Sequence, residues 1–271
     1  MGKVSEQFEL SVTRFTGKRE HVDVPEEADA IGPRAFAFNR AMRTVRIPDG
    51  VTSIGEEAFV GCMSLVEVDL PASVEEIGRG AFRGCLRLER VRVRGAVERI
   101  EDEAFLRCKS LREVELADGV EEIGEAAFMR CASLERLRLP DTVRTIGDRA
   151  FCECAALDIA ALPQELEEVE DEAFKGCASL QRAELPAHVG WLGRRCFADC
   201  TALTEAVVPE GVGSLEEGAF EGCTSLRRVE LPTSLEVIED RAFFDCPALE
   251  DVQASDAVRL GRQVFGLSKG A

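Results

Sequence analysis

A phenylalanine recurs every 23 residues through most of the chain, and this spacing constrains the fold more than any other feature. The positions are Phe36, Phe59, Phe82, Phe105, Phe128, Phe151, Phe174, Phe197, Phe220 and Phe243, and Phe265 follows after 22 residues. A fixed period of this length is the signature of a repeat architecture, in which each repeat packs on its neighbours. We number the repeats as rungs one to ten, after these ten phenylalanines.

Other columns repeat when the rungs are aligned on Phe. The residue before Phe is Ala except at Cys196, and Leu stands six residues after Phe in nine rungs. Apolar residues recur nine and eleven residues after Phe, as at Val68 and Leu70, and Pro follows in seven rungs. This alternation, ended by Pro, predicts one short parallel-sheet strand per rung. The Ala-Phe pair, with no alternation around it, predicts a short helical turn in each rung.

A single rung carries too few apolar side chains to form a core, so the rungs must stack. We therefore expect residues 22–265 to form a solenoid of ten full rungs plus partial rungs at its ends. Residues 1–21 do not fit the repeat, and the alternation of Phe8, Leu10 and Val12 predicts a capping strand over the first core layer. Residues 266–271 are expected to be a frayed tail.

The repeat unit resembles a known family. Its form, Ile-Gly-x-x-Ala-Phe-x-x-Cys-x-x-Leu-x-x-Val-x-Leu-Pro-x-x-Val, is similar to the BspA-like leucine-rich repeats over about residues 22–265. The resemblance implies a right-handed leucine-rich-repeat solenoid with a parallel sheet on one side, and a role in binding proteins. Many members of the family are bacterial or protist surface proteins that attach to host or matrix proteins.

Nine of the eleven cysteines occupy one column, three residues after Phe, and an Asn takes that place in rung one. The column is Asn39, Cys62, Cys85, Cys108, Cys131, Cys154, Cys177, Cys200, Cys223 and Cys246. Asn and Cys are similar in size and both can bond to backbone, so we interpret the column as a structural ladder. Parallel side chains on stacked rungs would strain disulfides, and no rung supplies a second metal ligand beside its Cys. We expect reduced thiols, no metal and no other cofactor.

Charge and motif content narrow the function. With 33 basic and 51 acidic residues the net charge is -18, which repels phosphate backbones and anionic lipid head groups. We therefore expect a protein partner, neither nucleic acid nor direct membrane insertion, and a monomer in isolation. His21 and His188 have no catalytic constellation beside them, and no phosphate-binding loop or zinc spacing occurs. No catalytic residues are predicted, and the chain is not expected to be an enzyme.

The outward strand column, ten residues after Phe, points to a candidate interface. It alternates in sign through rungs one to five, as Arg46, Asp69, Arg92, Glu115 and Arg138, and this regularity fails from rung six onward. Trp191, the only Trp, falls in the same part of the array and is expected to face outward. The candidate partner-binding residues are Trp191, Ile159, Ala161, Arg182, Glu184, Glu205 and Val207.

A second candidate surface is a convex stripe one residue after Phe, formed by Leu106, Met129 and Cys152, with Cys152 expected to be partly exposed. A mostly acidic corner column that includes Asp102, Asp148 and Asp171 is interpreted as a solvated face, with calcium or a basic partner as the alternative.

Three functions remain open: a non-catalytic scaffold or adaptor binding through the strand face, an exported or surface adhesin, and a structural subunit of a larger assembly. No signal peptide, lipid-anchor motif or membrane-spanning stretch is visible in the sequence, so we expect a cytoplasmic location.

Overall fold

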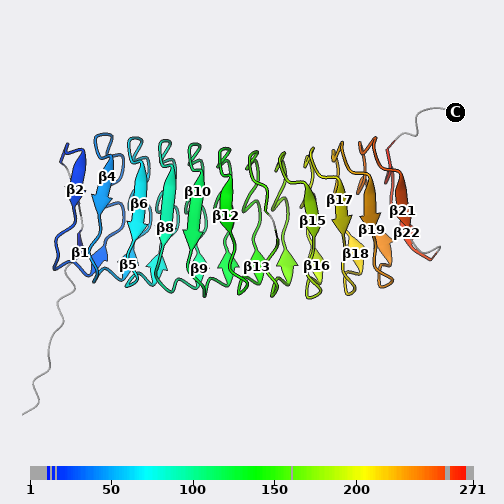
Figure 1. The fold of residues 1–271 in the computed structure, drawn as a ribbon, viewed down its shortest axis with the longest axis horizontal. Helices are drawn as coiled ribbons and strands as arrows, with labels where there is room; N and C mark the ends of the chain where they lie inside the picture. Colours follow the sequence, from blue (N-terminus) through cyan, green and yellow to red (C-terminus); the bar gives the residue numbers. More distant parts are fainter. Residues whose placement is uncertain (1–10, 13, 16, 160, 254–256, 267–271) are drawn as a thin grey trace, which may run out of the picture.

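The computed structural model describes residues 11, 12, 14, 15, 17–159, 161–253 and 257–266. Within these residues the chain forms a parallel β-solenoid whose rungs stack side by side along one long axis (Figure 1). Within each sheet, neighbouring strands are equivalent strands of successive rungs and pair in parallel, so that Val68 lies opposite Val91. The predicted repeat solenoid with its short strands is therefore confirmed.

The longer strands form two front sheets, separated by a break at rung six. The first contains β2 (His21–Asp23), β4 (Thr44–Arg46), β6 (Glu67–Leu70), β8 (Arg90–Val93), β10 (Glu113–Leu116) and β12 (Arg136–Arg138). The second contains β15 (Arg182–Glu184), β17 (Glu205–Val207), β19 (Arg228–Glu230) and β21 (Asp251–Gln253).

Two-residue strands form three further sheets, which we call the second sheets. The first contains β1 (Ser11–Val12), β3 (Ala30–Ile31), β5 (Ser53–Ile54) and β7 (Glu76–Ile77). The next contains β9 (Arg99–Ile100), β11 (Glu122–Ile123), β13 (Thr145–Ile146), β14 (Glu168–Val169) and β16 (Trp191–Leu192). The last contains β18 (Ser214–Leu215), β20 (Val237–Ile238) and β22 (Arg259–Leu260).

The segment around each Phe is a run of tight turns, and the prediction of a short helical turn is wrong. Backbone N–H groups alternate in direction there: that of Val60 donates to Glu57 within the rung at 3.0 Å, and that of Phe59 donates to Ala81 in the next rung at 2.7 Å. A helix would direct every N–H back within its own segment, to the residue three before it in a 3₁₀-helix or four before it in an α-helix. Glu57 and Gly61 have φ values of 53° and 65°, which interrupt a right-handed helical path.

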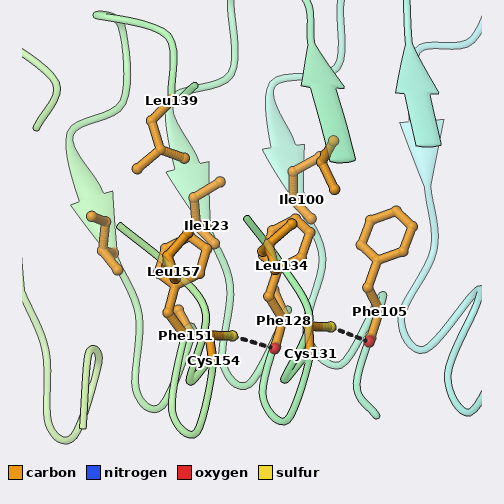
Figure 2. Close-up of a cluster of buried hydrophobic side chains, with 14 of the residues drawn as sticks. Ile100, Phe105, Ile123, Phe128, Cys131, Leu134, Leu139, Phe151, Cys154 and Leu157 are labelled. Atoms are coloured by element: carbon orange, nitrogen blue, oxygen red, sulfur yellow. Dashed lines mark hydrogen bonds between the residues drawn. The ribbon is translucent and has the colours of Figure 1, made fainter. Parts of the chain in front are cut away.

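The core is a column of phenylalanine rings with aliphatic side chains packed beside it (Figure 2). From Phe36 to Phe265, successive ring centroids lie between 4.9 and 5.8 Å apart. Neighbouring rings are inclined by at most 14°. Ring spacing therefore follows the spacing of the rungs, about 4.8 Å. A ring in this column is covered by other rings on both faces, which a single rung cannot provide.

The N-terminal segment closes the first core layer. Val12 in β1 lies opposite Ile31 in β3, and the ring of Phe15 lies 5.3 Å from that of Phe36. Phe15 thus continues the ring column although it stands 21 rather than 23 residues before Phe36. Phe8 and Leu10 of the predicted cap lie outside the described residues, as does the predicted frayed tail from residue 267 onward.

Candidate functional site

The cysteine column lies inside the solenoid and bonds to backbone. Cys131 donates its thiol hydrogen to the Phe105 carbonyl at 3.2 Å, and Cys154 donates to the Phe128 carbonyl at 3.0 Å (Figure 2). In rung one, Asn39 Oδ1 accepts the N–H groups of Ala41 and Met42, each at 3.0 Å. All eleven cysteines are free thiols.

Burial makes these thiols poor nucleophiles. The loss of hydration raises the pKa of Cys131 well above its usual range and that of Cys200 to about 12. A thiolate, the reactive form of cysteine, is therefore disfavoured in this column. What the column supplies is a hydrogen bond from each rung to the rung before it.

The acidic corner column also serves the backbone. Asp102 Oδ1 accepts the N–H of Glu125 at 3.0 Å, and Asp148 Oδ1 accepts the N–H of Asp171 at 3.0 Å. Asp171 in turn accepts the N–H of Arg194 at 2.7 Å. Within the described part of the chain, no three His, Cys, Asp or Glu side chains are grouped so as to hold a metal ion.

The convex stripe is not an exposed apolar surface. Cys152 is only 4% exposed, contrary to the expectation of partial exposure, and Leu106 and Met129 are half-buried. Side-chain length contributes to the difference, because the short side chains of Val60 and Ala198 in this column are also only 4% and 2% exposed. Neighbouring rungs cover these short side chains, whereas the longer ones extend past them.

The front face of rungs two to five carries an ordered ladder of ion pairs. Eight residues after Phe, one outward column alternates in charge as Glu67, Arg90, Glu113 and Arg136. The register places these residues opposite one another on neighbouring strands. Arg90 Nε lies 3.0 Å from a Glu113 oxygen, and Arg136 lies 3.9 Å from the other one.

This column resumes its alternation after rung six. Arg182 Nη2 lies 2.5 Å from Glu205 Oε2, and Arg228 lies 3.8 Å from the other oxygen of Glu205. The loss of alternation from rung six onward therefore concerns the column ten residues after Phe and does not extend to this one. From rung two to rung ten, the one uncharged residue in the column eight residues after Phe is Ile159 in rung six.

Rung six breaks the front sheet. None of the described residues between 158 and 162 belongs to a strand, and the sheet that ends at β12 starts again at β15. A side chain takes over part of the connection, because Asp158 Oδ1 accepts the N–H of Gln181 at 3.3 Å. Ile159 is only 7% exposed, so it does not stand outward on the front face as its column predicts. Burying an isoleucine side chain is favourable by about 1.5–3 kcal/mol, which explains its inward position.

A cavity of about 370 Å³, the rung-six pocket, opens between rungs six and seven. Its lining consists of Ile159, Ala161, Leu162, Gln164, Phe174, Leu180, Arg182, Ala183, Glu184, Leu185, Pro186 and Phe197. Ala183 stands nine residues after Phe, in an inward column where rungs one to four have Val and rung five has Leu137. A smaller side chain leaves volume unfilled in this column, beside the buried rings of Phe174 and Phe197.

The structure brings some of the predicted contact residues together and separates others. Ala161, Arg182 and Glu184 share the wall of the rung-six pocket. Glu205 pairs with Arg182, and Val207 lies opposite Glu184 on the neighbouring strand. Trp191 is 45% exposed but belongs to β16 in a second sheet, paired with β14.

The described residues form strands and turns without any helix, and so they include no helix able to span a membrane.

Comparison with known proteins places these features in a family. A sequence profile described as the BspA type leucine rich repeat region, in 6 copies, matches residues 29–158 and 145–270. Among curated proteins, none matches this chain significantly.

Solved structures share the fold. A leucine-rich repeat protein from Bacteroides ovatus is 23% identical, with a TM-score of 0.70 over 91% of this chain and 76% of that one. A leucine rich cell surface protein from Faecalibacterium prausnitzii is 24% identical, with a TM-score of 0.52 over 96% of this chain and 94% of that one. At these identities the likeness concerns the fold.

Proposed function

This chain belongs to the BspA-type leucine-rich-repeat family, and we propose that it is a non-catalytic scaffold that binds a protein partner through its front sheets at rungs six to eight. One observation carries the proposal: the interruption of an otherwise regular front face at rung six, with a pocket beside it. Regular rungs stabilise a repeat scaffold, so an irregular rung that lacks its front strand is a candidate binding site.

The chemistry of the chain supports a binding role over catalysis. Cysteine thiols are the most numerous candidate nucleophiles of the chain. Burial raises the pKa of the ladder thiols, as at Cys85 and Cys177, and so keeps them in the unreactive protonated form. His21, the histidine of the first front strand, is exposed and lies 2.7 Å from Thr44 Oγ1. A His–hydroxyl pair acts as base and nucleophile only when a third group orients the imidazole, and within the described residues no carboxylate hydrogen-bonds to His21.

A surface role is the second candidate, because the Faecalibacterium prausnitzii protein is described as a cell surface protein. The expected cytoplasmic location gains no support from that relative. The two roles use the same face and differ in the compartment of the partner. Labelling of intact cells with a membrane-impermeant biotin reagent distinguishes them, since a surface protein is labelled and an internal one is not.

The test is affinity capture from native lysate with three forms of the chain. The first is wild type, the second carries Arg182→Glu and Val207→Asp on the second front sheet, and the third carries Trp191→Ala on a second sheet. Far-UV circular dichroism first shows that all three are folded. We expect a partner that wild type and Trp191→Ala retain and that the double variant loses.

Retention by the double variant with loss by Trp191→Ala would move the interface to the second sheets. Capture of nothing by wild type, from lysate and from extracellular fractions alike, would count against a binding role.

A further inference from the structure

We propose that the rung-six pocket receives one large apolar side chain from a partner segment that carries an Asp or Glu beside that side chain. This inference rests on the proposed function, and it specifies the contact point and the chemistry of the partner. The argument has two parts, one concerning the pocket and one concerning the arginines around it.

The pocket suits a single large apolar group. Its volume of about 370 Å³ lies at the small end of ligand sites, which span about 300–1,000 Å³. Ile159, Leu162 and Leu185, which are 7%, 9% and 6% exposed, give the pocket aliphatic walls, while the rings of Phe174 and Phe197 are each only 1% exposed. An apolar side chain entering here exchanges water contact for contact with these aliphatic walls. The polar lining is confined to Gln164, Arg182 and Glu184, which can orient a polar neighbour of that side chain.

The charge pattern indicates an anionic neighbour. In the regular rungs Glu113 lies between Arg90 and Arg136, at 3.0 and 3.9 Å. At rung six the equivalent position holds the buried Ile159, so the column runs from Arg136 directly to Arg182 without a carboxylate between them. Strands two rungs apart are about 10 Å apart, the gap that Glu113 spans in the regular half. A carboxylate of the partner fits the same gap.

The second outward column gives the same result. In this column Arg138 of rung five is followed by Ala161 in rung six, where an acidic residue would continue the alternation. Glu115, the register neighbour of Arg138 in β10, is paired with Arg92 at 3.2 Å. Among the residues that the structure describes, Arg138 forms no ion pair. Its guanidinium is therefore available to a partner.

The carboxylates nearest the pocket are already engaged by this chain. Glu184 lies 3.7 Å from Arg182, and Asp158 accepts the side-chain amide of Gln181 at 3.1 Å. Glu135, on the strand side of rung five, lies 3.6 Å from Arg112. An acidic segment can thus bind at rung six although the chain as a whole carries a net charge of -18.

The test uses a phage-displayed library of random 12-residue peptides, selected on the full chain. We expect enriched peptides to carry Leu, Met, Phe or Trp within two residues of Asp or Glu. Synthetic versions should bind at least tenfold more weakly to Ala183→Leu, which fills the pocket, and to Ala161→Glu, which places the chain's own carboxylate beside Arg138. Arg138→Gln should weaken binding several-fold, whereas Arg46→Gln, the same change in the same column at rung one, should leave it within twofold.

Peptides that bind Ala183→Leu as tightly as wild type, that lack acidic residues, or that are not enriched at all overturn the inference. Ala183→Val, which restores the residue of rungs one to four, replaces the Leu variant if circular dichroism shows that one to be misfolded. The proposed function is judged separately by lysate capture. A protein lost by the Arg182→Glu, Val207→Asp variant but retained by Ala183→Leu supports front-face binding and refutes the pocket.

Discussion

Rungs two to five and rungs six to seven use the same columns and the same core, yet their front faces differ. In the first group, Val or Leu fills the inward column, and charged residues such as Arg90 and Glu113 form ladders across the strands. In the second, Ala183 leaves a pocket, and Ile159 turns inward and leaves rung six without a front strand. The ring column is continuous through both groups.

The difference shows that the two sides of a rung can change independently. The ring of Phe151 remains fully buried and stacked 5.3 Å from that of Phe174, while the front strand of the same rung is absent. The turn side is held by hydrogen bonds to both neighbouring rungs and by the rings. A front strand can therefore be altered for binding while the stack stays intact.

The largest effect is expected from alkaline pH, which should destabilise both groups of rungs together. Burial raises the pKa of Cys85 and Cys131 in the regular rungs, and of Cys177 and Cys200 beyond the break, the last to about 12. The unfolded thiols titrate near pH 8.5, so the unfolded state loses protons first. The free energy of unfolding should be constant below about pH 8 and fall above about pH 8.5, by roughly 1.4 kcal/mol per pH unit for each buried thiol.

Urea unfolding at pH 8, 9 and 10 in reducing buffer measures this effect, because the chain has no Tyr to titrate in that range. Far-UV circular dichroism reports the whole solenoid, and Trp191 fluorescence reports rungs six and seven, because Trp191 lies opposite Glu168. An unchanged midpoint from pH 8 to 10 contradicts the burial of the ladder. Separate transitions for the two probes would show that the break uncouples the two groups.

The next effect compares two core phenylalanines. Phe128→Ala removes a ring that is 0% exposed in the regular half, and we expect a loss of about 3–5 kcal/mol in the free energy of unfolding. Phe174→Ala removes a ring that lines the pocket, so part of its surroundings is already open, and the loss should be smaller by about 1 kcal/mol. Denaturant unfolding of both variants measures the two losses. Equal losses would mean that Phe174 is packed as tightly as Phe128 and that no open space lies beside it.

Exchanging Val and Ala in the inward strand column compares the filled core of the regular rungs with the rung-six pocket. Val114, only 3% exposed, fills the position in rung four that Ala183 occupies in rung seven. Val114→Ala should lower the free energy of unfolding by about 1–3 kcal/mol, because it creates a void. Ala183→Val should raise it by up to about 1 kcal/mol, because its methyl groups enter an existing space. A destabilised Ala183→Val variant would mean that the walls cannot accept Val.

The smallest effect concerns the charge ladder. Ala161→Glu supplies the acidic residue that would follow Arg138 in this column and should raise the free energy of unfolding by less than about 1 kcal/mol, since exposed ion pairs contribute little. The matched change in the regular half, Glu115→Ala, should lower it by a similar amount. Both changes should shrink in 0.5 M NaCl, because salt screens exposed charges. A gain in stability for Ala161→Glu that does not change with salt would mean that the substitution acts through the local backbone rather than through charge pairing.

Much of the fold could be predicted, and less of the site. The Phe period, the inward apolar columns and the cysteine column all recur many times, so each interpretation was supported by many rungs. The helical turn was wrongly predicted because the Ala-Phe sequence is compatible with a helix, and only the positive φ values at positions such as Glu57 and the bonds to the next rung exclude one. Trp191 drew attention by its type, although its strand lies in another sheet than Arg182.

The pocket left a signal in the sequence that was passed over. Ala160, Ala183 and Ala206 follow one another in a column that otherwise holds Val or Leu, and three small residues in one inward column indicate missing volume. Ala160 itself lies outside the described residues. The exposure of Ile159 was wrongly inferred from its column, because a column assigns a side only while the strand persists.

By itself, the sequence determined the repeat length, the stacking of rungs and the identity of the core columns, because a pattern repeated ten times at a period of 23 has a single consistent packing. Tertiary structure alone decided where the front sheet breaks, which way Ile159 turns, and that Ala161, Arg182 and Glu184 surround one pocket. Those outcomes depend on how neighbouring rungs fill or leave space, and that balance of packing and hydrogen bonding involves several rungs at once.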